Sequence, residues 1–127
     1  MSTLKVNNLQ DINGGNNSTP EQVLQGRAKA WIHFSANDNS IRDSFNISSI
    51  DDLGTGAHRI NFTNSFANKN YCAVSMSGEF ANLLGNNPER IPRVSNFNTG
   101  SIIYCNRTAT GGSGDDNYQG LAIFGDQ

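Results

Sequence analysis

The chain has 127 residues, a length typical of one domain built around one compact core. Hydrophobic residues make up 35% of it and charged residues only 16%, while Asn, Gly, Ser and Thr are abundant, which favours short strands and turns over long helices. The formal net charge is −2 and the basic residues are scattered singly, which excludes the basic face typical of nucleic-acid-binding proteins. We therefore expect no nucleic-acid partner.

Membrane insertion is also not expected. No stretch approaches the roughly 20 consecutive apolar residues that cross a bilayer, and residues 1–10 lack the apolar core of a signal peptide. Cys72 and Cys105 both lie in strand-like apolar runs. We expect them to be small buried side chains and not a disulfide.

The first segment, residues 1–17, carries few apolar residues. They alternate briefly and then give way to the turn-forming run NGGNNS. These side chains cannot form a core of their own: Leu4, Val6, Leu9 and Ile12. The segment is therefore expected to pack on its own domain, on a sister chain or on a larger assembly.

A short helix is predicted next. Ser18 or Thr19 can cap it, and Pro20 suits the first helical position. A helix over residues 20–25 is well below the roughly 12 to 15 residues at which isolated helices become marginal in water. It is expected to form only if its two apolar side chains find a partner surface: Val23 and Leu24.

From residue 30 the apolar pattern changes to the period of two that is typical of strands. The first strand ends at the turn cluster SANDNS, residues 35–40, and residues 44–63 read as a hairpin with Phe45 and Ile47 on one face and a bulge before Ile50. In the second part of the hairpin, His58 alternates with two apolar residues. Further strands are predicted over 71–76, 101–107 and 118–124, and a loop with two prolines over 86–92.

This pattern predicts an all-β fold, an antiparallel β-sandwich of jelly-roll-like type. We assign the sandwich domain to residues 26–127. Residues 1–25 form a separate segment for attachment or oligomerisation, with a short β segment and the short helix.

One motif indicates a cation site. The run GGSGDDNYQ, residues 111–119, fits the calcium-binding nonapeptide of parallel β-helices, with Asp116 as the acid. Those sites need stacked copies and this chain has one, so a strand connection is favoured and cation binding stays open. His33 and His58 lack the spacing of metal ligands, and no nucleophile turn is present. We expect a non-enzymatic protein with no catalytic residue, metal or cofactor.

Three runs in order, GRAKAWIHF, IRDSFNISSIDDLGTGAHRINFT and NKNYCAVSMSG, resemble a module of tail-fibre-like and other virion structural proteins of tailed phages, especially marine and cyanobacterial ones. The resemblance covers residues 26–78. The run TLKVNNLQDINGG also resembles the short β element that precedes such modules. The chain departs from the family pattern at His58, where an aromatic residue is usual.

The resemblance implies a virion structural protein, a tail-fibre-like appendage component that forms a homotrimer and contacts other virion proteins. It would be made in the host cytoplasm and displayed on the particle surface. Two alternatives remain: a capsid decoration or head-fibre knob, and a module that binds host-surface glycan.

These expectations assign two sets of residues. Attachment falls to the apolar side chains of the first 25 residues, Leu4, Val6, Leu9, Ile12, Val23 and Leu24. Receptor-facing loops supply the second set: Asn86, Asn87, Arg90, Asp115, Asp116 and Tyr118. Aromatic rings with a polar group are further candidates for a sugar surface: Trp31, Tyr71, Tyr104 and Tyr118.

Overall fold

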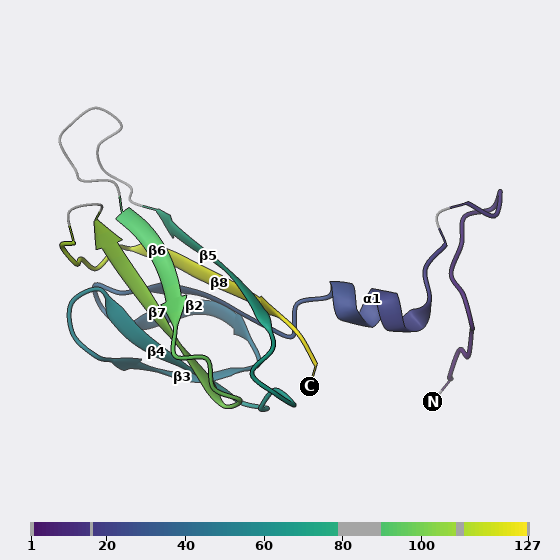
Figure 1. The fold of residues 1–127 in the computed structure, drawn as a ribbon, viewed down its shortest axis with the longest axis horizontal. Helices are drawn as coiled ribbons and strands as arrows, with labels where there is room; N and C mark the ends of the chain where they lie inside the picture. Colours follow the sequence, from purple (N-terminus) through teal and green to yellow (C-terminus); the bar gives the residue numbers. More distant parts are fainter. Residues whose placement is uncertain (1, 16, 79–89, 109–110, 127) are drawn as a thin grey trace.

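The computed structural model describes residues 2–15, 17–78, 90–108 and 111–126. They form one helix and two four-stranded antiparallel sheets with the strand orders β2-β1-β8-β5 and β3-β4-β7-β6 (Figure 1). The elements are α1 (Pro20–Gly26), β1 (Ala30–Ser35), β2 (Ser40–Phe45), β3 (Ile47–Asp52), β4 (Ala57–Phe62), β5 (Cys72–Gly78), β6 (Arg90–Ser95), β7 (Ser101–Thr108) and β8 (Tyr118–Phe124). The predicted all-β sandwich is confirmed.

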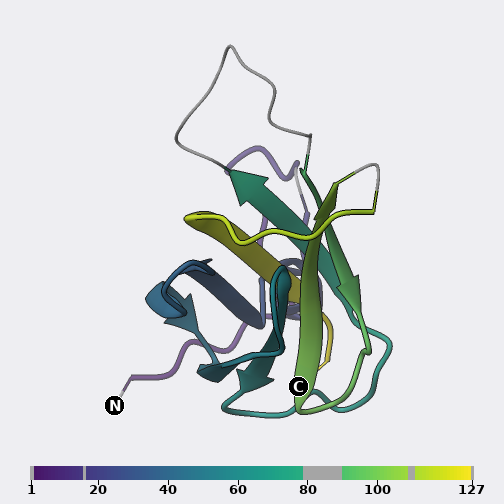
Figure 2. The same cartoon turned by 90° about the vertical axis from the view of Figure 1, so that its left-hand side faces the viewer.

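The core lies between the two sheets, which pack face to face (Figure 2). Alternate residues of the central strands point inward, because successive side chains of a strand lie on opposite faces. Each large side chain that is fully buried in this way stabilises the fold by about 1.5 to 3 kcal/mol. The buried hydrophobic residues are Ala30, Ile32, Phe34, Ala36, Ile60, Phe62, Phe66, Tyr71, Ile102, Tyr104, Leu121 and Ile123.

Asn46 is the point where the chain passes from the first sheet to the second. Its φ of 59° is left-handed, a conformation that Asn tolerates better than most residues. Its Nδ2 donates hydrogen bonds to the carbonyl oxygens of Lys29 and Asn64, both at 3.1 Å, and its Oδ1 accepts one from the backbone N–H of Asn64 at 2.7 Å. The prediction that Phe45 and Ile47 share one face of one strand is wrong, because the turn at Asn46 places them in β2 and β3 of different sheets.

The hairpin of β3 and β4 is confirmed, with its register irregularity between Ile47 and Ser49. Its turn depends on Gly56, whose φ is +70°. A Cβ at this position would lie 2.6 Å from the backbone oxygen of Asn106 and 2.8 Å from the backbone nitrogen of Gly114. Only glycine allows the turn to approach β7 and the segment after it so closely.

The prediction of a loop over residues 86–92 is wrong at its C-terminal end, where residues 90–92 belong to β6. Pro92 lies within β6 and faces Asn106 of β7. β6 is an edge strand, and an edge strand tolerates a proline because one of its sides has no ladder of hydrogen bonds to complete. Residues 86–89 lie outside the described part of the chain.

Both cysteines are free, as expected, but their predicted burial is not observed. Cys72 is exposed and Cys105 is intermediate. The reason is strand direction: Cys72 alternates with the inward-facing Ala73 and therefore lies on the outer face of β5.

Candidate functional site

The N-terminal arm, the described residues 2–15 and 17–26, extends away from the sandwich (Figure 1). Its only strand-like pairing in the described residues is an isolated antiparallel bridge between Leu9 and Ser18, with both N–H to O distances at 2.8 Å. The β segment expected here is thus reduced to one bridge. Local hydrogen bonds give this part of the arm a bend but no core.

The helix α1 forms as predicted and is one residue longer. Thr19 and Gln22 make a reciprocal capping box: the Thr19 hydroxyl accepts from the N–H of Gln22 at 3.2 Å, and the Gln22 side chain accepts from the N–H of Thr19 at 2.9 Å. Such a cap is worth about 1 kcal/mol. No residue of α1 is buried, so the cap is the main local stabilisation of a helix too short to persist alone.

All six predicted attachment residues are exposed. Ile12 is 100% exposed and Leu4 83%, while Val23 and Leu24 are each 49% exposed. Leu9 and Val6 are also classed as exposed. The sandwich of the same chain therefore leaves the apolar side chains of the arm largely in contact with solvent.

The outer face of the sheet β2-β1-β8-β5 carries a second uncovered apolar surface. The strand register sets Phe45, Trp31, Ala122 and Val74 side by side in one row across all four strands. In the next row Met76 lies against Gly120, so closely that a Cβ at residue 120 would come within 2.8 Å of Met76 Cγ. We call the set the apolar face: Trp31, Phe45, Val74, Met76, Gly120 and Ala122.

The apolar face is hollowed. A depression of about 370 Å³ is lined by β1, β5 and β8, with Trp31, Val74 and Met76 among its walls. Val74 is 60% exposed and Met76 56%. Large apolar side chains exposed together on one sheet are typical of a surface that meets a partner.

The apolar face ends in an aromatic and basic group of side chains at the start of β8. Tyr118 of β8 stacks on His33 of β1 with ring centroids 6.0 Å apart, and the guanidinium carbon of Arg42 lies 4.3 Å from the centroid of the Tyr118 ring. This cation–π contact orients Arg42 and leaves less of the Tyr118 ring free. Tyr118 begins β8, as the predicted strand over residues 118–124 implies, and it is intermediate in exposure; its receptor-facing role stays a prediction.

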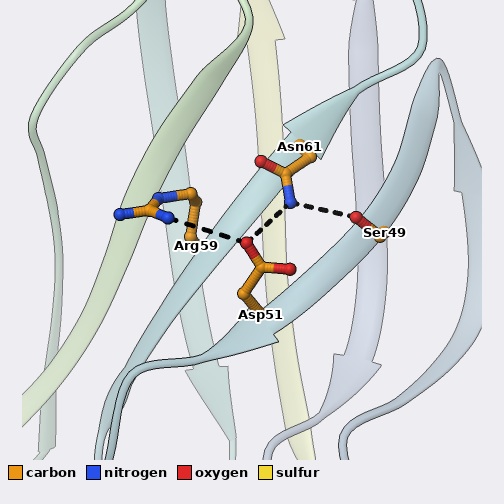
Figure 3. Close-up of polar contacts among 4 residues, drawn as sticks. All are labelled: Ser49, Asp51, Arg59 and Asn61. Carbon is orange, nitrogen blue, oxygen red and sulfur yellow. Dashed lines mark hydrogen bonds and ion pairs between the residues drawn. The ribbon is translucent and has the colours of Figure 1, made fainter.

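The part of the other sheet's outer face that β3 and β4 form is hydrophilic by contrast. Figure 3 shows Asn61 of β4 donating to Ser49 Oγ at 2.9 Å and to Asp51 Oδ2 at 3.1 Å, with Arg59 3.7 Å from the same Asp51 oxygen. This pair is partly exposed and is worth little in stability, but it keeps this part of the face hydrated. The outer surface of β3 and β4 therefore differs in chemistry from the apolar face.

Four of the six predicted receptor-facing residues lie in the described part of the chain. Asn86 and Asn87 lie outside the described residues, and Arg90 begins β6. Asp115 accepts a hydrogen bond from the backbone N–H of Gly56 at 2.7 Å, which fixes the hairpin turn. Asp116 is only 2% exposed, so its prediction as a receptor-facing residue is wrong.

Asp116 instead belongs to a buried polar cluster. Its Oδ2 accepts from the Ser77 hydroxyl at 2.6 Å and from the Asn106 side-chain amide, which ties β5 and β7 to the segment before β8. Nearby, the Tyr104 hydroxyl donates to the carbonyl oxygen of Met76 at 2.8 Å, and burial raises the pKa of Tyr104. Over the described residues, no group of three or more His, Cys, Asp or Glu side chains could hold a metal ion.

His58 and Gln119 are two buried side chains, among the described residues, whose polar atoms all lack a hydrogen-bond partner. His58 is 1% exposed, and neither ring nitrogen has a hydrogen-bond partner. Its ring meets Phe34 edge to face at 5.6 Å. Burial lowers the pKa of His58, and the charges of Asp115 and Asp52 only partly oppose this effect.

Two surfaces thus remain as candidates for function, the arm and the apolar face. Sequence reasoning found the arm and missed most of the apolar face, although Trp31 was singled out for its ring. The signal was present in Val74 and Met76, apolar residues on the face of β5 opposite its inward-facing side chains.

Comparison with known proteins assigns no role to these surfaces. No family model, no curated protein and no solved structure matches the chain. As for membranes, none of the helices in the described part of the chain is long and apolar enough to span a bilayer.

Proposed function

We propose that this chain is a non-enzymatic structural protein of a phage virion, a tail-fibre-like appendage component that assembles as a homotrimer. The arm attaches each copy to its sisters and to the larger particle. The sandwich, residues 26–127, is displayed at the particle surface. The assignment to a virion and to a trimer rests on the sequence resemblance of residues 26–78.

The observation that carries the assembly role is the uncovered arm. Six apolar side chains of the arm are exposed, and no residue of its helix is buried. Exposed apolar area costs about 25 cal/mol per Å², so a partner that covers the arm stabilises the complex. A closed symmetric assembly provides such cover to every copy alike.

Removal of residues 1–25 tests this function. The shortened chain keeps the whole sandwich core, because every residue of the hydrophobic core lies at position 30 or later. We expect it to fold, to run as a monomer in light scattering where the full chain is a trimer, and to be lost from assembled particles. Circular dichroism of the strands serves as the folding control.

A double substitution gives a sharper form of the test. Val23→Ser with Leu24→Ser removes both apolar side chains of α1 and leaves the Thr19–Gln22 cap in place. Gln25→Ser in the same helix is the matched control, since it replaces one polar side chain by another. A shortened chain that keeps the oligomeric state of the full chain and still enters particles would contradict the assembly role.

The two alternatives have less support. A head-fibre knob would use the arm in the same way, and imaging of a labelled particle would separate it from a tail appendage. A glycan-binding role needs free aromatic faces and convergent polar groups, yet Arg42 lies over one face of the Tyr118 ring and the Asp116 carboxylate is buried. Binding of the full chain to a glycan array would favour that role over the one proposed.

A further inference from the structure

The uncovered apolar side chains of this chain are concentrated in two places. Among the described residues, thirteen large hydrophobic side chains are exposed: Leu4, Val6, Leu9, Ile12, Val23, Leu24, Trp31, Ile41, Phe45, Leu53, Val74, Met76 and Ile91. The arm holds six of them and the apolar face four, which leaves three scattered singly. Scattered apolar residues are ordinary on a protein surface, whereas two dense groups on one chain need an explanation.

The chemistry of the hollow selects the kind of occupant. Its lining is mostly apolar, and among its described residues the side-chain polar groups belong to His33, Ser75 and the indole N–H of Trp31. Sugars and small polar ligands are held by several convergent hydrogen-bonding groups, which this hollow does not offer. Aliphatic side chains of a peptide segment fit it better, and Met76 can adapt its shape to them because its side chain is flexible.

We propose that the apolar face of one copy binds the helix α1 of a neighbouring copy, with Val23 and Leu24 seated in the hollow between β1, β5 and β8. This inference rests on the proposed assembly role of the arm and names the surface that receives it. Each copy gives one arm and receives one, so the contact closes around the symmetry axis without leaving an unsatisfied arm.

The two surfaces are continuous at the base of the arm. A second hollow of about 320 Å³ is lined by Arg27 and Ala28 of the linker together with Trp31 and Phe45 of the apolar face. Trp31 therefore borders both hollows. A neighbouring arm that enters past the linker meets Trp31 and Phe45 before it reaches Val74 and Met76.

The area involved requires both surfaces. A stable interface buries about 800 Å² on each partner, while a single exposed apolar patch on a monomer covers roughly 300 to 600 Å². An apolar patch of that size alone falls short of a standard interface. In an arm exchange each copy buries its own face under one neighbour and its own arm on another, so the area of the arm adds to that of the face.

The joint between α1 and β1 directs the arm outward. The N–H of Lys29 donates to the carbonyl oxygen of Ile123 at 2.8 Å, which fixes the chain beside the end of β8 just before β1 begins. Only residues 27–29 separate the helix from the strand, and α1 points away from the sandwich (Figure 1). A neighbour is therefore better placed than the same copy to receive α1.

Charge placed on the apolar face tests the inference in the full chain. Val74→Glu and Met76→Glu, alone and together, alter side chains that are more than half exposed, so the fold should be kept. We expect the double variant to lose the oligomer and to scatter as the 13.7 kDa monomer, just as the arm deletion is expected to scatter as a monomer of its own smaller mass. Leu53→Glu is the matched control: this leucine is 44% exposed, lies outside the apolar face, and should leave the oligomer unchanged.

A crosslink then identifies the contact itself. One copy carries Leu24→Cys and the other Val74→Cys, both with Cys72→Ser because the native Cys72 is exposed on the same sheet. When the two are mixed and mildly oxidised, a disulfide between them supports the inference, and Leu53→Cys in place of Val74→Cys should give at least tenfold less product.

The outcomes separate this inference from the proposed function. If the arm deletion is monomeric but V74E/M76E keeps the oligomer and no crosslink forms, the assembly role stands and the apolar face is not the receiving surface. If the arm deletion keeps the oligomer, the assembly role itself fails. If the full chain is a monomer in which a chain carrying both cysteines crosslinks within itself, α1 covers its own face and both proposals are wrong.

Discussion

The buried histidine makes the stability of this fold depend on pH in a way that can be calculated. His58 is 1% exposed without a hydrogen-bond partner on either nitrogen, and burial lowers its pKa below the ordinary 6.5. The folded chain therefore holds His58 neutral, while the unfolded chain takes up a proton as the pH falls below 6.5. Protons bind the unfolded state more strongly, so acid reduces the free energy of unfolding.

The magnitude follows from one proton. From pH 6.5 downward the free energy of unfolding falls by up to about 1.4 kcal/mol for each pH unit, until the pKa of folded His58 is reached. The charges of Asp115 and Asp52 favour the charged ring and reduce this loss. A hydrogen bond from the N–H of Gly54 lowers the pKa of Asp52 from 3.8, so this carboxyl titrates below the window where His58 acts.

The variant His58→Phe removes the titrating group and keeps a ring against Phe34. We expect its free energy of unfolding at pH 7.5 to change by less than about 2 kcal/mol. The larger phenyl ring destabilises the packed core, while removing two buried nitrogens without hydrogen bonds stabilises it. Between pH 6.5 and 5 the variant should lose markedly less stability than the parent. Urea unfolding at fixed protein concentration, followed by the fluorescence of the single Trp31, measures both.

A control separates titration from packing. Ile60→Val on the same strand removes one buried methylene and should cost about 1 kcal/mol at every pH, which shifts the stability curve without changing its slope. If H58F loses stability between pH 6.5 and 5 as steeply as the parent, the unpartnered histidine is not the source of the acid sensitivity.

Two further substitutions probe the turns. Gly56→Ala should cost about 2 kcal/mol or more in urea unfolding, because its left-handed φ and the 2.6 Å approach to the Asn106 oxygen both reject a Cβ, whereas Gly54→Ala, with open space around it, tests the φ penalty alone. Asn46→Ala should cost about 2 to 3 kcal/mol in thermal or urea unfolding, since it loses the side-chain hydrogen bonds that hold the crossing between sheets. A loss below about 0.5 kcal/mol in either case would contradict the role given to that turn.

The parts of the fold that could be predicted depend on neighbours in sequence. The alternation of Ile32 and Phe34, or of Ile60 and Phe62, identifies a strand and its inward face, because the strand period of two is a local property. The cap at Thr19 and the end of α1 could also be predicted from the sequence. A capping box joins residues only three positions apart, so it is a local feature.

The parts that could not be predicted depend on which strands pair. Phe45 and Ile47 alternate as if they shared a strand, and only the left-handed turn at Asn46 separates them into two sheets. Asp116 sits in a glycine-rich run typical of an exposed turn, yet packing against Ser77 and Asn106 buries it. Nothing local distinguishes these cases from their exposed counterparts.

The candidate site divides in the same way. The first 25 residues contain too few apolar side chains to form a core, so the arm needs a partner surface. Both statements follow from composition alone. The apolar face does not, because Trp31, Val74 and Ala122 come from strands far apart in the chain and become neighbours only through the register of β1, β5 and β8. The sequence determines which side chains are apolar and gain from burial. Long-range strand pairing decides which of them share a surface, because the backbone hydrogen bonds between strands do not depend on the side chains that they bring together.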